Sequence, residues 1–273
     1  MGIDVVNRRQ FVRVIAAGSL LGAGAASLKA DDSKEVDYVK VYKDLRPTFI
    51  TLDLTPDKGG GVSSGVALDL NKYGRGIITN AHCVVSSSQA AIDSVGNARE
   101  ELLLAEAKKD IRITLPDGKV IKGRPLIVNK DGRLRAAIHP DLDLAIVIPE
   151  TDITQNTKAA KLASKSPPVG TQIISMGNHG GGYNPKGMVF YVGEFKGITE
   201  GLYGRGTPVK VTIAELTTCI RGGDSGSGAH RVDTGELIGI NYSSISGDGV
   251  NDARALAVES VRSFLNMYGV ELA

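Results

Sequence analysis

The chain of 273 residues has no tryptophan, two cysteines and four histidines, and it lacks an apolar run long enough to cross a bilayer. Cys83 and Cys219 form at most one disulfide, which excludes a domain held together mainly by such bridges, and we expect both thiols to be free. The longest mildly apolar segment, residues 14–28, is shorter than the roughly 20 residues of a transmembrane helix. These absences favour a protein that is held together by its own core.

The chain also lacks a large excess of charge of one sign, with 32 Lys and Arg against 30 Asp and Glu. Residues 1–30 contain four basic residues and one acidic residue, so the rest of the chain has a net charge of −1. Nucleic-acid binding depends on neutralising many phosphates. We therefore expect no nucleic-acid partner.

The N-terminal segment is expected to be an export signal. The pair Arg8-Arg9 precedes the apolar segment, and small residues follow up to Ala30. This resembles a bacterial twin-arginine signal, although Asn7 and Val12 depart from the usual pattern. The resemblance implies removal of this signal, after either Ala25 or Ala30, a periplasmic or secreted protein, and no membrane span afterwards. An ordinary secretory signal and an uncleaved anchor are the alternatives.

Glycine is abundant, at 34 residues, and the apolar runs are short, which predicts an all-β fold with tight turns. Residues 111–115 alternate between apolar and polar, and a hairpin turn at 116–119 follows. The expected strands are residues 48–52, 65–70, 76–79, 111–115, 120–121, 143–148, 172–176, 189–195, 209–214, 236–242 and 254–258.

Two segments read as helical. Residues 89–110 place Ile92, Val95, Leu102 and Leu103 roughly on one face, which predicts a helical insertion at the surface. Near the C-terminus, Ser260 is expected to cap a last helix. Lysines and prolines in residues 151–168 predict a connector between a first half, residues 37–150, and a second half, residues 169–273.

Two short motifs contain candidate catalytic groups. His82 follows the expected strand 76–79, and Ser225 lies among glycines in the run Gly222-Gly223-Asp224-Ser225-Gly226. A serine hydroxyl is a weak nucleophile unless a neutral imidazole takes its proton, and a carboxylate then orients the imidazole. The other histidines lack a spacing typical of metal ligands, so we expect neither a metal nor an organic cofactor; they are His139, His179 and His230.

Two carboxylates precede the expected strand 143–148. Asp141 and Asp143 are two residues apart, so both face the same side of an extended chain. Alternation alone leaves both as candidates for the carboxylate that orients His82.

The motifs resemble those of trypsin-like serine proteases. The run from Thr79 to Cys83 is similar to the TAAHC-type motif, and the glycines around Ser225 are similar to the GDSGG and GNSGS loops. Segments 65–69, 113–118 and 235–241 resemble the corresponding segments of HtrA/Deg-type peptidases. The resemblance implies two perpendicular six-stranded Greek-key β-barrels and a short C-terminal helix. The stretch after Ser225 is shorter than a PDZ domain of about 80–100 residues, so none is expected.

The resemblance also assigns roles. In the family the catalytic aspartate directly precedes a Leu-Ala or Ile-Ala pair, which selects Asp143 beside His82 and Ser225. The amides of Gly223 and Ser225 would form the oxyanion hole, supported by Asp224. The implied substrate pocket consists of Cys219, Tyr242, Ser243 and Ser244.

This pocket would accept small or medium uncharged residues, and the activity would be that of a secreted serine endopeptidase acting on proteins or peptides. Two alternatives remain. One is a catalytically silent binding protein or chaperone on the same fold. The other is an esterase, against which the absence of the Ser-Asp-His order of α/β-hydrolases argues.

Overall fold

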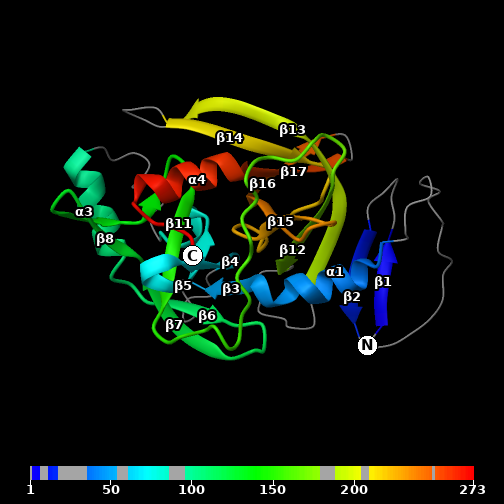
Figure 1. Cartoon of the computed structure of the whole chain (residues 1–273), viewed down its shortest axis with the longest axis horizontal. Helices are drawn as coiled ribbons and strands as arrows, with labels where there is room; N and C mark the ends of the chain where they lie inside the picture. Colours follow the sequence, from blue (N-terminus) through cyan, green and yellow to red (C-terminus); the bar gives the residue numbers. More distant parts are fainter. Residues whose placement is uncertain are drawn as a thin grey trace.

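The computed structural model describes residues 2–6, 12–17, 36–53, 61–85, 96–178, 188–203, 209–247 and 250–273 (Figure 1). The short helix α1 (Tyr38–Leu45) is capped by the Asp37 carboxylate, which accepts a hydrogen bond from the Lys40 N–H. No helix within these residues is long and apolar enough to cross a membrane.

The first half of the chain forms a closed barrel of six antiparallel strands. The strand order is β11-β5-β4-β3-β6-β7, and β11 also pairs with β7, which closes the sheet. The strands are β3 (Phe49–Asp53), β4 (Val62–Leu70), β5 (Gly74–Thr79), β6 (Ile111–Thr114), β7 (Val120–Pro125) and β11 (Leu144–Pro149).

The second half forms a second ring of strands, in the order β13-β12-β15-β16-β17-β14, which the pairing of β13 with β14 closes. Its strands are β12 (Gln172–Asn178), β13 (Met188–Tyr203), β14 (Val209–Leu216), β15 (Gly228–Arg231), β16 (Leu237–Gly247) and β17 (Val250–Ala257). The hairpin β1 (Gly2–Val6) and β2 (Val12–Ala17) extends this sheet beside β13. The predicted all-β fold of two barrels is confirmed.

Both faces of the central strands are buried. Ala67, Ile77 and Val147 fill the first barrel, whereas their neighbours Leu68 and Ile78 pack into a cluster shared with the second barrel. Successive residues of a strand point to opposite faces, so one strand contributes to two cores. This shared cluster holds the two barrels together.

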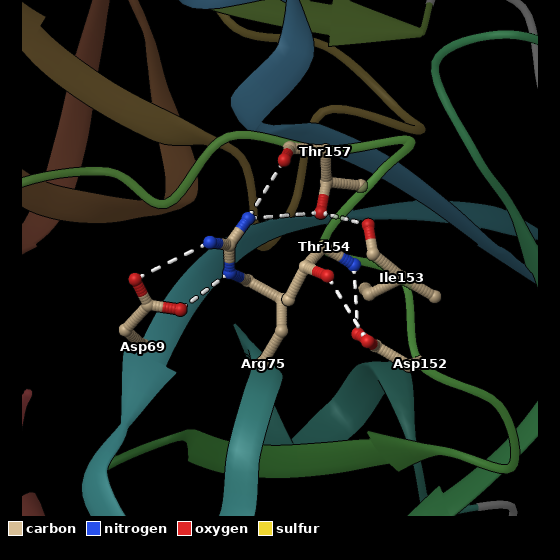
Figure 2. A network of polar contacts seen from close by, with 6 residues as sticks. All are labelled: Asp69, Arg75, Asp152, Ile153, Thr154 and Thr157. Atoms are coloured by element: carbon tan, nitrogen blue, oxygen red, sulfur yellow. Dashed lines mark hydrogen bonds and ion pairs between the residues drawn. The ribbon is translucent and has the colours of Figure 1, made fainter.

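The connector is tied to the first barrel by Arg75 on β5 (Figure 2). Its guanidinium binds the Asp69 carboxylate at 2.5 and 3.2 Å and donates to the Thr157 carbonyl oxygen at 2.7 Å. Thr157 in turn donates to the Ile153 carbonyl oxygen at 2.7 Å. A connector without helix or long strand is thus held by an almost buried cation.

The C-terminal helix α4 (Val258–Met267) packs on β14, β16 and β17. Ser260 does not cap it, so this expectation is wrong: the helix begins at Val258. The Ser260 hydroxyl accepts from the Thr212 N–H at 2.7 Å and donates to the Thr212 carbonyl oxygen at 3.0 Å. Ser260 therefore provides hydrogen bonds to backbone groups of the neighbouring strand β14 instead of capping its own helix.

The insertion contains α3 (Gly96–Glu106), and Leu103 packs from it against the first-barrel core. Ile92 and Val95 lie outside the described residues. Three short strands were not anticipated: β8 (Ile127–Lys130), β9 (Arg133–Ala136) and β10 (Ile138–His139). The last of these leads into the turn before β11.

Candidate active site

His82 lies in a short 3-10 turn, η4 (Ala81–Cys83), directly after β5. Its neighbours Ala81 and Cys83 are buried, at 3% and 4% exposure, whereas the His82 side chain is 41% exposed. Adjacent residues of a 3-10 turn point about a third of a turn apart. Burial of the two neighbours therefore orients the imidazole outward.

Asp143 contacts this imidazole from the turn before β11. Its Oδ2 lies 2.8 Å from His82 Nδ1, and its Oδ1 accepts the His82 backbone N–H at 3.0 Å. The Asn80 side chain donates to the Asp143 carbonyl oxygen at 3.0 Å. One carboxylate thus binds both the ring and the backbone of the same histidine.

Asp143 adopts a left-handed backbone conformation, with φ +51°. Such a conformation costs a residue other than glycine roughly 1–2 kcal/mol, so surrounding contacts must maintain it. The Asp143 N–H donates to the Pro140 carbonyl oxygen at 3.2 Å, and Leu142 between them is buried. The strained turn points the carboxylate back toward η4.

The electrostatics of the pair favour a positive imidazole. Burial lowers the pKa of His82, but hydrogen bonds with Asp143 and with the adjacent Cys83 raise it, and the resulting pKa lies above 6.5. In the neutral ring Nδ1–H donates to the carboxylate and Nε2 is left as the proton acceptor; the carboxylate then stabilises the imidazolium that forms. The arrangement matches the requirements of a general base.

Asp141, the other candidate, faces a different partner. Its Oδ2 lies 2.5 Å from Arg99 Nη1 on α3, and the two side chains are only 5% and 15% exposed. Asp143 rather than Asp141 is therefore the carboxylate that contacts His82.

Ser225 lies in a loop that is held by backbone contacts to the first barrel. Its carbonyl oxygen accepts the Ser64 N–H at 2.8 Å, and the Ser64 hydroxyl donates to the Gly223 carbonyl oxygen at 2.7 Å. Gly226 has φ +86°, and a Cβ there would overlap with the Ser64 carbonyl oxygen. Only glycine allows this close approach of loop and barrel.

The loop leaves two amide groups available. Asp224 and Gly226 donate their N–H groups to the carbonyl oxygens of Arg221 and Asn241. Within the described residues, no acceptor contacts the N–H of Gly223 or Ser225. The buried Asp224 carboxylate accepts the Arg221 N–H at 2.8 Å, which braces the loop. Two free amides on one loop are what an oxyanion hole requires.

His82 and the loop that carries Ser225 are neighbours. The Cys83 thiol donates to the Ser225 carbonyl oxygen at 3.7 Å, which places η4 beside the loop. No hydrogen bond joins the His82 and Ser225 side chains in the part of the chain that the structure describes. Such bonds are often long until substrate binds, so this geometry is compatible with catalysis.

The expected pocket residues are only partly assembled by the described side chains. Cys219 is buried against Val189 and Tyr191, while Tyr242 occupies a bulge of β16 next to Ser243. The side chain of Ser244 lies outside what the structure describes.

Arg221 was missed by the sequence analysis of this pocket. The Cys219 sulfur beside its guanidinium raises the pKa of Arg221, which places an exposed cation next to the expected base of the pocket. Its position two residues after Cys219 was the available signal.

The cysteines and the other histidines have structural surroundings. Cys83 and Cys219 are free thiols. Burial lowers the pKa of His230 to about 4, and this ring contacts the Gly235 carbonyl oxygen at 3.1 Å. His179 lies outside the described residues. Among the residues described, no three His, Cys, Asp or Glu side chains are grouped so as to hold a metal ion.

Two closed β-barrels, with a histidine–aspartate pair on the first and a serine in a glycine-rich loop on the second, define a chymotrypsin-type peptidase fold. Residues 63–240 match the model of the family described as "Trypsin-like peptidase domain". The chain belongs to this family of trypsin-like serine proteases.

Solved structures share the fold at low sequence identity. The active form of the Rv3671c protease from M. tuberculosis has a TM-score of 0.60 and 16% identity, covering 90% of this chain and 96% of that chain. Deg5 has a TM-score of 0.55 and 18% identity, covering 86% and 96%. A search of curated proteins finds no matching sequence. At these identities the likeness shows the fold alone.

Proposed function

We propose that this protein is a serine endopeptidase in which Ser225, His82 and Asp143 form the catalytic triad. The observation that carries the proposal is the 2.8 Å contact between His82 Nδ1 and Asp143 Oδ2, beside a loop with two free amides. A binding role alone gives no reason for this combination of groups.

The proposed reaction uses these groups one after another. His82 Nε2 removes the proton of the Ser225 hydroxyl as its oxygen attacks the peptide carbonyl carbon, and Asp143 stabilises the imidazolium. The amides of Gly223 and Ser225 bind the developing oxyanion. The imidazolium then gives its proton to the leaving amine, which yields an acyl-enzyme. Water activated by His82 hydrolyses the ester and releases Ser225.

The test is labelling of Ser225 by a fluorophosphonate probe, together with casein hydrolysis. Replacing Ser225 by alanine should abolish labelling and lower kcat by about 10⁴–10⁶-fold, because the triad acts as a unit. Its circular dichroism should stay that of the parent protein. Absence of labelling in the parent protein would favour the silent binding protein, and turnover of small esters without peptides would favour the esterase.

For specificity we propose cleavage after small or medium uncharged residues. Cys219 is small and neutral and packs with Val189, and the bulge at Tyr242 narrows the opposite side. Fluorogenic peptides that differ only at the residue before the cleaved bond test this. Because Arg221 lies beside Cys219, a preference for Glu or Asp is the result that overturns the proposal.

We further propose that the protein is exported through the twin-arginine pathway. The support is the Arg8-Arg9 pair ahead of the apolar segment 14–28. Replacing both arginines by lysine should retain the precursor in the cytoplasm. Normal export of that variant points to the general secretory route instead.

A further inference from the structure

The ion pair between Arg99 and Asp141 joins the insertion helix to the active-site turn. Both side chains are nearly buried, at 15% and 5% exposure, and the pair lies only two residues before Asp143. A buried ion pair usually stabilises a fold no better than a well-packed apolar pair does. Charged partners at this place therefore call for an explanation other than stability.

The turn that carries Asp141 also directs Asp143. Within it, the Leu142 N–H donates to His139 Nδ1 at 3.2 Å and the Asp143 N–H donates to the Pro140 carbonyl oxygen. Burial lowers the pKa of His139, which keeps the ring neutral so that Nδ1 can accept. Asp143 itself has the strained φ of +51°. A strained residue keeps its conformation only where its surroundings determine it on several sides.

We propose that Arg99 is a positioning residue for the peptidase: by anchoring Asp141, helix α3 holds the turn in which Asp143 is aimed at His82. The first contact runs from Arg99 to Asp141, and the second from Asp143 Oδ2 to His82 Nδ1. The insertion thus belongs to the catalytic apparatus instead of being a surface excursion. The inference rests on the proposed triad.

A cavity of about 180 Å³ lies beside Arg99 and makes the proposal testable by chemical rescue. It is lined by Arg99, His139 and Pro140, with Arg135 and Tyr268 on other sides. Removing the Arg99 side chain joins its volume to a cavity that already exists. A methylguanidinium ion then has room to bind beside Asp141.

The experiment compares Arg99→Ala with Arg135→Ala, which removes an arginine from the same cavity without touching Asp141. Since a misplacement near 1 Å costs roughly 10²-fold in rate, we expect kcat of Arg99→Ala to fall by about that factor with little change in KM. Methylguanidinium should restore most of the lost kcat. Arg135→Ala should keep its kcat and show no response to the added cation.

A second readout does not depend on activity. The Nδ1 proton of His82 gives a downfield NMR resonance when it is hydrogen-bonded to a carboxylate. We expect this resonance to weaken or shift in Arg99→Ala and to return with methylguanidinium. An unchanged resonance and kcat overturn the proposal, and so does a loss of kcat that methylguanidinium does not reverse.

Failure of the triad proposal can be told apart from failure of the positioning role of Arg99. If the parent protein neither labels with fluorophosphonate nor cleaves casein, the triad proposal fails, whereas the resonance still tests whether Arg99 positions Asp143. If Arg99→Ala does not fold, Arg99→Lys replaces it, because lysine keeps the charge but not the forked geometry. We then expect about a tenfold lower kcat with a shifted resonance; values equal to those of the parent protein refute the positioning role.

Discussion

The substitution Asp143→Asn isolates the electrostatic part of the proposed triad. Asp143 Oδ1 accepts the His82 backbone N–H, and Oδ2 faces His82 Nδ1. An asparagine in the same place keeps its oxygen on the backbone N–H and presents its NH₂ group to Nδ1. The ring must then carry its proton on Nε2, where it cannot accept the proton of Ser225.

The expected loss of activity has two parts, the missing hydrogen bond to a carboxylate and the wrong tautomer of the imidazole. A hydrogen bond to a charged group contributes roughly 1.5–3 kcal/mol, and one such bond disappears. The wrong tautomer adds to this loss, and the same change in a serine protease triad costs about 10⁴-fold in kcat. We therefore expect kcat/KM of Asp143→Asn to fall by about 10³–10⁴-fold on a peptide substrate.

The pH profile gives a second, signed expectation. Only neutral His82 acts as a base, so activity is lost as the pH falls through its pKa. In the parent protein the contacts with Asp143 and Cys83 raise that pKa above 6.5, so the acid limb should lie above pH 6.5. Asparagine removes the Asp143 contribution while burial still lowers the pKa, so the limb should move to lower pH.

The assay is kcat/KM against pH for the parent protein, Asp143→Asn and Asp141→Asn, with circular dichroism as the control for folding. Asp141→Asn keeps the contact between His82 and Asp143 and should lose far less activity. A variant Asp143→Asn within tenfold of the parent refutes the reasoning. A larger loss in Asp141→Asn would move the carboxylate role to that residue.

Two further predictions concern stability, measured by urea unfolding. Ser260→Ala removes the hydroxyl that binds the buried N–H and carbonyl oxygen of Thr212, so it should lower the free energy of unfolding by about 1–3 kcal/mol. Ser263→Ala, on the exposed face of the same helix, should change it little. Gly226→Ala forces a Cβ against the Ser64 carbonyl oxygen at φ +86° and should cost roughly 1–3 kcal/mol or more, while Gly222→Ala meets nothing within 4 Å. Equal losses within either pair would contradict the corresponding contact.

Much of the fold could be predicted because it depends on local patterns. The alternation in residues 111–115 corresponds to β6, and the turn at 116–119 leads into β7. The strands β8 and β9 were missed because their burial is uneven: Leu134 is exposed between two arginines, so no alternation signals a strand. They form because they pair with each other.

Ser260 shows how tertiary contacts override a local signal. A serine near the start of an apolar run predicts a helix cap. Here the strand β14 passes close enough for the hydroxyl to bind both backbone groups of Thr212, and the helix begins two residues earlier. Nothing within the helix itself reveals that neighbour.

The sequence by itself determined the residue types of the candidate site and their order, because His82 and Ser225 lie in motifs whose neighbours are adjacent in the chain. It did not choose between Asp141 and Asp143 on alternation alone, since both face one side of an extended chain. The tertiary structure decided this, because Asp143 takes a left-handed φ toward His82 and Asp141 binds Arg99. His82 and Arg99 lie far from these two aspartates in the sequence, and only the folded chain brings them to the turn that carries Asp141 and Asp143.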